Sequence, residues 1–240
     1  GNFHATIRAT PGPGETIRLA WDCPPGLAEH VASVEFQARY AGYDENGNRD
    51  SEDWHGFTKD HEPVAVAGTG KPPGFGTDWD LSMIPDQRGM AVRAKVRFRD
   101  LPGVVYLTPA LEGLSTPERP ERVSLASAED LPSPFWSRAD RKPSCSIPVD
   151  VDPEDIRRAQ LHLVVWEGGR GNVEHPLSLN GHDLPTPAWK GRHEPIYTVL
   201  DIDPALLRRG DNRVQVHSDT HHHGIEVCLP GPALMIRSTP

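Results

Sequence analysis

The sequence lacks any apolar run approaching the roughly 18 residues that a membrane-spanning helix needs, which excludes such a helix. Cysteine is scarce as well: Cys23, Cys145 and Cys228 form no Cys-x-x-Cys pair, which argues against a zinc knuckle or a thioredoxin-type motif. The opening GNFHATIRAT has no basic stretch followed by an apolar one. We therefore expect a signal peptide to be absent or already removed.

Positive charge is also in short supply. The formal net charge is −9, both halves of the chain are mildly acidic, and no basic stripe stands out. Because nucleic-acid binders normally carry a basic face, we expect no nucleic-acid partner. A polyanionic ligand is disfavoured for the same reason, except in a local pocket of arginines.

Proline and glycine, by contrast, are abundant. With 25 Pro and 22 Gly, the chain is a poor candidate for long helices, yet 36% apolar residues and six Trp can still build a core. Short strands joined by many turns fit this composition better. The sequence therefore predicts an all-β protein, and its 240 residues allow two domains.

Alternating apolar and polar residues mark the first half as antiparallel sheet. The pattern occurs at 16–21 and 33–41 and is most regular at 91–100, where aliphatic side chains alternate with Arg and Lys. The turn at 100–103 then leads into 103–111, which predicts a hairpin. We count about seven strands before residue 115 and predict an immunoglobulin-like β-sandwich over residues 1–117.

Residues 115–145 are rich in Pro, Ser and charge, so we place the domain boundary there, with an ordered crossover at 118–144. Beyond it, residues 145–240 predict a second sandwich. Its expected elements are strands at 146–151 and 160–166, a short helix at 152–159, and a strand that meets an Asn-Gly turn at 176–184. Residues 196–219 are expected to form a strand, a short helical turn that stops at Gly210 and a second strand, before the strands GIEVCL and ALMIR. Cys145 and Cys228 could form a disulfide if they lie on adjoining strands, or remain two separate thiols.

Three features of the second half resemble the jelly-roll, galactose-binding-like domains that accompany glycoside hydrolases. They are the turn Leu179-Asn180-Gly181, the run 200–212 that ends in Arg-Gly-Asp-Asn, and the strand that follows it. The first half resembles, more loosely, immunoglobulin-like accessory domains, through Trp79-Asp80, Pro85-Asp86 and the strand pair at 91–107. The resemblance implies a pair of secreted or cell-surface accessory modules, some of whose relatives bind sugars while others only brace a catalytic domain.

The segment SDTHHHGIEV at 218–227 is chemically unusual. On an extended chain His221 and His223 would share a face, so with His217 or Asp219 they could hold zinc or copper. However, the residues expected to point inward have even numbers on one strand, at Val214 and Val216, and odd numbers on the next, at Val227 and Leu229. The alternation is therefore interrupted between these two strands. Residues 218–224 are thus predicted to form a loop that binds metal, contacts a ligand or is inert.

Oxygen-bearing side chains in DENGNRD, residues 44–50, suggest a calcium loop. The pattern departs from an EF-hand loop because Arg49 stands where glycine is needed and His55 where the last glutamate belongs. No helices are predicted beside it. We therefore favour a polar hairpin turn with a solvated acidic rim over a calcium site here.

Sugar-binding proteins stack rings on exposed tryptophans, with polar side chains beside them. Three loop tryptophans, Trp54, Trp136 and Trp189, are therefore candidate ligand residues, together with Arg192 and His193 next to the last of them. Burial at a domain interface is the competing interpretation for these rings. The remaining tryptophans, Trp21, Trp79 and Trp166, are predicted to lie in the core.

Catalytic signals are few: the sequence has no Gly-x-Ser-x-Gly elbow and no phosphate-binding glycine loop. The favoured function is thus non-catalytic, the binding of a glycan or the positioning of a larger carbohydrate-active protein. One alternative is a metal- or histidine-dependent polysaccharide lyase or hydrolase that uses the 217–226 loop, with Glu226 as partner. Another is a structural scaffold without a binding site.

Overall fold

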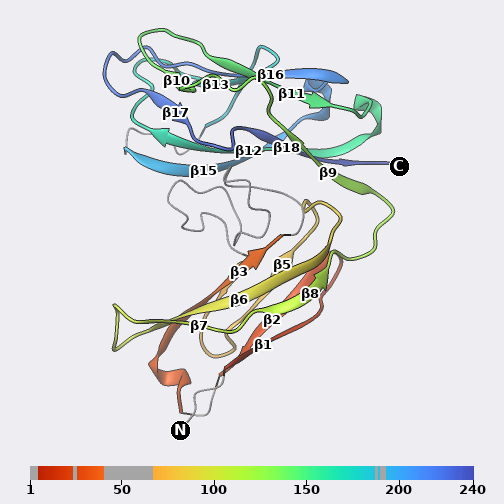
Figure 1. Cartoon of the computed structure of the whole chain (residues 1–240), viewed down its shortest axis with the longest axis vertical. Coiled ribbons are helices and arrows are strands. Elements are labelled where there is room, and N and C mark those ends of the chain that lie inside the picture. Colours follow the sequence, from red (N-terminus) through yellow and green to blue (C-terminus); the bar gives the residue numbers. More distant parts are fainter. Residues whose placement is uncertain (1–4, 24–25, 41–66, 187–188, 190–192) are drawn as a thin grey trace. The chain divides into compact units, whose positions relative to one another are not determined.

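The computed structural model describes residues 5–23, 26–40, 67–186, 189 and 193–240 (Figure 1). This part of the chain is almost entirely β-structure, and it contains no α-helix. It divides into two compact units at Arg119–Pro120. Three single 3₁₀ turns interrupt the strands: η1 (Ala28–His30), η2 (Pro153–Asp155) and η3 (Pro204–Leu206). None of the helical turns in the described residues has the length and apolarity to cross a bilayer.

Two antiparallel sheets form the first unit. The smaller has the order β1-β2-β5, and the larger has the order β4-β3-β6-β7 with β8 also paired to β6. The strands are β1 (Thr6–Pro11), β2 (Thr16–Asp22), β3 (Val31–Arg39), β4 (Gly68–Gly70), β5 (Gly76–Asp80), β6 (Arg88–Phe98), β7 (Val105–Leu107) and β8 (Leu111–Ser115).

One face of each sheet meets in a common core. Leu19 and Trp79 come from the smaller sheet, and Phe36 and Val96 from the larger, and all four are buried. Val92, Ala94 and Val96 are buried, as the alternation at 91–100 predicts. Phe98, which was expected on the same face, is only half-buried. Two sheets with one apolar face each thus enclose a single core in this unit.

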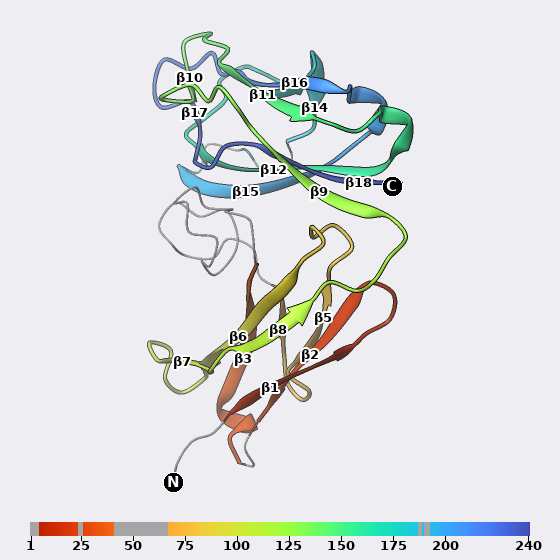
Figure 2. The same cartoon turned by 45° about the vertical axis from the view of Figure 1, so that its right-hand side comes forward.

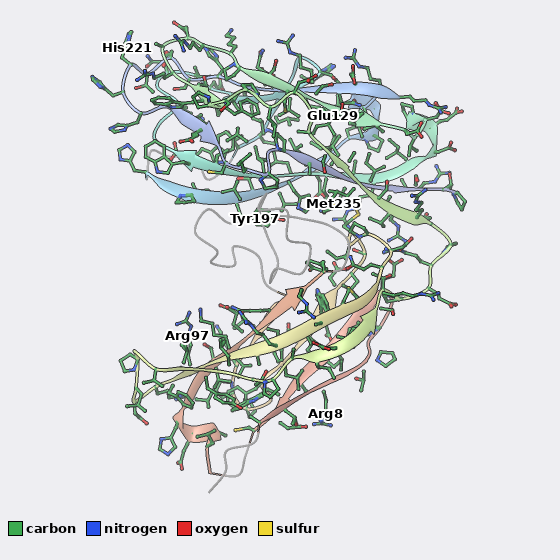
Figure 3. All side chains as sticks on the ribbon, viewed as in Figure 1. Arg8, Arg97, Glu129, Tyr197, His221 and Met235 are labelled. Atoms are coloured by element: carbon green, nitrogen blue, oxygen red, sulfur yellow. The ribbon has the colours of Figure 1, made fainter. Side chains whose placement is uncertain are left out.

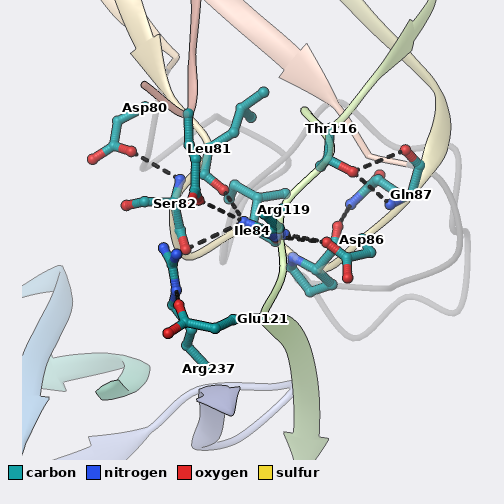
Figure 4. Close-up of polar contacts among 12 residues, drawn as sticks. Asp80, Leu81, Ser82, Ile84, Asp86, Gln87, Thr116, Arg119, Glu121 and Arg237 are labelled. Carbon is teal, nitrogen blue, oxygen red and sulfur yellow. Dashed lines mark hydrogen bonds and ion pairs between the residues drawn. The ribbon is translucent and has the colours of Figure 1, made fainter. Parts of the chain in front are cut away.

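A buried arginine marks the end of the first unit (Figure 4). The side chain of Arg119 is only 2% exposed and forms ion pairs with Glu15, at 3.1 Å, and with Asp86. Its guanidinium also donates hydrogen bonds to the backbone carbonyls of residues 81, 82 and 84. Such a buried cation is stable only because each of these acceptors reaches it.

Two sheets also form the second unit, one lying over the other (Figure 2). One has the order β10-β17-β12-β18-β9, with β15 also paired to β12, and the other has the order β11-β16-β13-β14. The strands are β9 (Arg122–Ser127), β10 (Trp136–Ser137), β11 (Ser144–Val149), β12 (Ile156–Glu167), β13 (Leu177–Leu179), β14 (His182–Leu184), β15 (Glu194–Ile202), β16 (Gly210–Val216), β17 (Ile225–Val227) and β18 (Ala233–Ser238).

Two buried or half-buried asparagines hold the turns of the smaller sheet. Asn180 and Gly181 have φ angles of 52° and 85°, as expected of the predicted Asn-Gly hairpin turn. The amide of Asn180 donates to the side-chain oxygen of Asn212 at 2.8 Å, and its own oxygen accepts from the Arg213 N–H. Asn212, fully buried, donates to the carbonyls of Arg208 and Gly210. Asn180, Gly181 and Asn212, on which the resemblance noted in the sequence partly rests, therefore stabilise turns of the fold.

Two local expectations, the helix at 152–159 and the burial of Leu229, are wrong. The helix predicted at 152–159 is one 3₁₀ turn, since Ile156 already begins β12, which pairs with both β15 and β18. The crossover expected at 118–144 is ordered: its β9 pairs with β18 and its β10 with β17, both strands of the second unit. Leu229, expected to be buried, is 63% exposed because β17 ends at Val227.

No disulfide joins Cys145 and Cys228, and all three cysteines lie in the described part of the chain. Cys145 is on β11 and packs into the core between the sheets, whereas Cys228 packs with Val164 and Ala233 in a separate cluster. The two-thiol alternative therefore describes this structure. Burial raises the pKa of the Cys145 thiol to about 12.

Candidate ligand-binding site

Two tryptophans and a glutamate form one rung across the six-stranded sheet of the second unit. Trp136 on β10 lies opposite Glu226 on β17, and Glu226 lies opposite Trp166 on β12. Residues opposite each other in antiparallel strands project to the same face, so the two indoles flank one carboxylate. Since neighbouring strands are about 4.8 Å apart, the two Trp backbones are about 10 Å apart.

The rung lies on the face of the sheet that points away from the core. Leu161, Leu163 and Val165 on β12 fill the core between the two sheets, so Trp166 projects to the opposite side. Its ring is half-buried. Trp166, predicted to lie in the core, is outside the core between the two sheets but packs against the separate buried cluster of Val164, Cys228 and Ala233. The alternation along β12 was the signal that could have placed it on this face.

His193 stacks on Trp166. Their ring centroids are 5.6 Å apart and the rings are nearly parallel, at 12°. The backbone N–H of His193 donates to the Glu167 carbonyl at 2.7 Å, and Nε2 donates to the Gly168 carbonyl at 3.1 Å. With the proton on Nε2, Nδ1 of this exposed imidazole is the nitrogen able to accept a hydrogen bond.

The 217–224 loop adds His223. Its ring centroid is 4.7 Å from that of His193 and 5.8 Å from that of Trp166. Its carbonyl accepts a hydrogen bond from the Trp136 indole N–H, which ties the loop to β10. His193 and His223 both have left-handed backbone, with φ angles of 57° and 64°, a conformation that is uncommon outside glycine and often found at functional sites.

Glycines permit the close approach of this loop to β12. A Cβ on Gly168 would lie 2.3 Å from the Trp166 ring and 2.6 Å from the His223 Cβ, and one on Gly224 would lie 2.1 Å from the Ser137 carbonyl oxygen. The Gly168 N–H donates to the Gly224 carbonyl at 2.8 Å. Residues with side chains would therefore push the two segments apart.

We call Trp136, Trp166, His193, His223 and Glu226 the aromatic platform. At its edge the guanidinium of Arg138 lies 4.1 Å from the Trp136 ring centroid, a cation–π contact. Rings offer apolar faces for sugar C–H groups, while Glu226 and the histidines offer acceptors for hydroxyl groups. The negative charge of Glu226 between the rings favours neutral ligands over anionic ones.

The candidate ligand residues thus separate into three groups. Trp136 and His193 lie in the platform, whereas Trp54 and Arg192 lie outside the described residues. Trp189 is buried in the core, where its indole N–H donates to the Thr198 hydroxyl at 3.1 Å. Trp189 therefore offers no ring face to a ligand, and the prediction that it stacks on a sugar is corrected.

The predicted metal ligands do not converge. Among the described residues no group of three or more His, Cys, Asp or Glu side chains could hold a metal ion. His217 contacts Asp140 at 3.2 Å, and Asp219 accepts from the backbone and side chain of Asn172. His221 is exposed and projects from the end of the loop (Figure 3).

The predicted loop at 218–224 is confirmed, since β16 ends at Val216 and β17 begins at Ile225. Its hydrogen bonds explain why the histidines separate: Ser218 N–H donates to the Ser137 hydroxyl, and its own hydroxyl donates to the Gly169 carbonyl. The loop is thus held to its neighbours and is not extended. The calcium loop predicted at 44–50 lies outside the described residues.

No protein-family model matches the sequence, and neither does any curated protein. Among solved structures, a β-porphyranase of glycoside hydrolase family 86 from the human gut bacterium Bacteroides plebeius is similar at 14% identity and a TM-score of 0.40, over 98% of this chain and 36% of that one. A family 86 structure in complex with neoagarooctaose is similar at 11% identity and a TM-score of 0.38, over 97% and 34%.

An exo-β-1,3-galactanase from Phanerochaete chrysosporium is similar at 8% identity and a TM-score of 0.29, over 96% of this chain and 56% of that one. These solved structures are of carbohydrate-active enzymes. This chain spans about a third of the length of the two family 86 structures. Likeness at these TM-scores is too low to carry a conclusion about the site or its ligand.

Proposed function

We propose that the protein is a pair of non-catalytic accessory modules, an immunoglobulin-like sandwich followed by a jelly-roll sandwich, which binds a neutral glycan. In this proposal the protein is secreted or lies at the cell surface and positions a larger carbohydrate-active protein on the glycan. The observation that carries the proposal is the rung Trp136–Glu226–Trp166, with His193 and His223 beside it.

The spacing of the platform supports an oligomeric ligand. The backbones of the two tryptophans are about 10 Å apart, further than one sugar ring extends, so we expect a chain of at least two sugars to contact both indoles. Between them Glu226 can accept hydrogen bonds from ring hydroxyls. Such a surface supports binding without requiring an acid–base pair or a metal, which is why binding is favoured over catalysis.

Affinity electrophoresis tests the proposal. The protein should be retarded in gels that contain at least one neutral polysaccharide from a panel of galactans, glucans, xylans and mannans. Trp166→Ala and His193→Ala should each weaken that binding about five-fold, because a lost stacking contact is worth on the order of 1 kcal/mol. Unchanged circular dichroism would show that the variants fold.

His182→Ala is the matched control, since His182 is exposed on β14, in the other sheet of the same unit. It should bind like the unmodified protein. Absence of retardation with every polysaccharide would favour a scaffold and contradict the proposal. Release of reducing or unsaturated sugars, abolished by His221→Ala or His223→Ala, would instead establish the enzyme alternative.

A further inference from the structure

Exposed aliphatic side chains gather in one hairpin of the first unit. Of the six large hydrophobic residues that are exposed in the described part of the chain, four lie between residues 101 and 107. They are Leu101 and Val104, in the turn after β6, and Val105 and Leu107, on β7, and each is between 42% and 56% exposed. Figures 1 and 2 show this turn projecting outward from the unit. Such clustering marks an interaction surface more often than scattered exposed residues do.

β7 lies at the edge of the larger sheet. It pairs with β6 on one side, and no strand in the described residues pairs with its other side. Thr108 N–H donates to the Ala94 carbonyl at 3.0 Å, so the main-chain groups of Thr108 point toward β6. Because these directions alternate along an antiparallel strand, the N–H and C=O groups of Val105 and Leu107 point to the open side.

Within β7 itself, which the structure describes completely, nothing protects the open side. Proteins commonly shield an edge strand with a lysine, a proline or a bulge, because an exposed apolar edge otherwise pairs with another chain. β7 reads Val-Tyr-Leu, and its register with β6 has no bulge. Arg97 and Lys95 lie opposite Val105 and Leu107, but on β6, one strand away from the edge. The edge is therefore uncharged and able to pair.

We infer that this edge pairs with the same edge of a second copy of the chain, in an antiparallel dimer with two-fold symmetry. In this register Val105 lies opposite Leu107 of the second copy, and Leu107 lies opposite Val105 of the second copy. Residues opposite each other at such positions exchange both main-chain hydrogen bonds, so the pairing forms about four of them. The same register brings the side chains of Val105 and Leu107 together on one face of the joined sheet.

The length of the strand is the reason to choose a second copy over a different partner. The turn at 101–104 precedes β7, and Pro109, which has no N–H, follows it. A longer strand would thus find only Val105 and Leu107 to pair with, whereas an identical strand is matched completely. An interface in which the same patch serves both copies also closes after two chains and does not extend into fibres.

The local charges do not oppose this register. Arg97 and Lys95 of each copy lie on β6, which is three strand spacings, or about 14 Å, from β6 of the other copy. That separation exceeds the Debye length of about 8 Å at physiological salt, so these like charges are screened from one another. The net charge of −9 on each chain repels a second copy at low salt. We therefore expect the association to strengthen as salt is added.

Analytical ultracentrifugation from about 10 µM to about 1 mM tests the inference, since so short an edge buries less than a standard interface and should give a weak dimer. We expect a monomer–dimer equilibrium that shifts toward the dimer when NaCl rises from about 50 mM to about 300 mM. A monomer at every concentration would overturn the inference. Association that weakens with salt would also overturn it, because such association would depend on ion pairs.

Val105→Lys should weaken the association at least about ten-fold, because it places an ammonium group against aliphatic residues of the second copy. Leu107→Lys should do the same. The matched control is Val199→Lys, which adds the same charge at a valine of β15 that is 41% exposed, compared with 42% for Val105. It should stay within about two-fold of the unmodified protein. Equal losses at 105 and 199, in variants whose circular dichroism is unchanged, would contradict the assignment to β7.

A cysteine cross-link tests the register, in a Cys23→Ser background that removes the least buried native thiol. In the dimer the Cα atoms of residue 105 in one copy and residue 107 in the other are about 5.5 Å apart, within disulfide range, whereas the two copies of residue 105 lie beyond that range. A mixture of Val105→Cys and Leu107→Cys should therefore cross-link at least about ten times faster than either variant alone. Faster cross-linking of either variant with itself would exclude this pairing.

The inference goes beyond the proposed function and does not depend on it, because β7 and the aromatic platform belong to different units. Trp166→Ala should leave the association unchanged even where it abolishes glycan binding. Each proposal can thus fail while the other stands. Loss of the dimer in Trp166→Ala would move the interface to the second unit and overturn the inference.

Discussion

The outward faces of the larger sheets in the two units carry opposite chemistry. In the first unit β6 presents Arg and Lys beside exposed aliphatic residues, whereas in the second unit β12 and its neighbours present tryptophans around Glu226. In both sheets successive side chains point alternately toward the core and away from it, and the core-facing ones are apolar. The contrast shows that the core-facing positions of the two sheets share one chemistry while the outward positions are free to differ.

The two units also differ in the polar groups that they bury. The first encloses the cation of Arg119 among carboxylates and carbonyls, and the second encloses the neutral amide of Asn212 among backbone groups. Breaking a buried ion pair lowers the free energy of unfolding more than breaking a buried hydrogen bond between neutral groups. The reason is that the remaining charged partner stays buried without its counterion. Substitutions at these two positions should therefore have unequal effects.

The largest effect is expected at Arg119. Arg119→Ala should lower the free energy of unfolding of the first unit by about 3–5 kcal/mol, since it leaves Glu15 and three carbonyls without their buried donor. Urea denaturation followed by tryptophan fluorescence measures it, because Trp21 and Trp79 lie in that core. Arg97→Ala, at an exposed arginine of the same unit, should change stability by less than about 0.5 kcal/mol. If Arg119→Ala and the substitution at the exposed arginine lowered the free energy of unfolding equally, the special cost expected for the buried charge would be contradicted.

A somewhat smaller effect is expected at Asn212. Asn212→Ala should cost about 3 kcal/mol, because the carbonyls of Arg208 and Gly210 and the amide of Asn180 lose a buried partner. Asn172→Ala, at an exposed asparagine, should cost under about 1 kcal/mol. A loss at Asn212 larger than that at Arg119 would reverse the ranking of charged and neutral burial.

The smallest effect is a pH dependence that differs between the units. Burial lowers the pKa of His162 on β12 to about 4, although the carboxylate of Asp201 acts in the opposite direction. The unfolded chain, with a pKa near 6.5, then binds the proton more readily than the folded chain. The free energy of unfolding should therefore fall by about 2 kcal/mol as the pH falls from 7 to 5. His162→Gln should flatten this part of the curve.

His30, in the first unit, provides the opposite sign. The hydrogen bond that His30 donates from Nδ1 to the Asp100 carboxylate, at 2.9 Å, is the main cause of its raised pKa. Its contribution to stability is therefore present at pH values below about 6.5 and is lost as the pH rises through its folded pKa. His30→Gln should leave the decline between pH 7 and 5 in place. Removal of that decline by His30→Gln instead of His162→Gln would contradict the assignment.

Much of the local structure could be predicted from residues close together in the chain. The alternation along β6, the Asn180-Gly181 turn and the break in phase after Val216 each depend on a few neighbouring residues, and each is confirmed. The start of β12 at Ile156 could not be predicted in this way. There, pairing with β15 and β18 outweighs the helical tendency of residues 152–159.

The candidate site was predictable only in part. Trp136 and His193 were recognised as residues with suitable chemistry, although Trp136 lies on β10 and not in a loop. Trp189, expected to stack on a ligand, is buried, and Trp166, expected in the core, is half-buried on the outward face. Exposure of a large ring depends on what packs over it, and the Thr198 hydroxyl that receives the Trp189 N–H lies on another segment. The platform itself requires β10, β17 and β12 to be neighbours, which is a property of the sheet order.

By itself the sequence determined the all-β character, the strand faces and the turns, because side-chain direction alternates along any extended chain and Gly, Asn and Pro restrict the backbone locally. Only the tertiary structure decided which loops meet, which tryptophans are exposed and where the histidines point. Those outcomes depend on contacts between residues far apart in the chain, such as that between Trp136 and His223. No short stretch of sequence contains both partners.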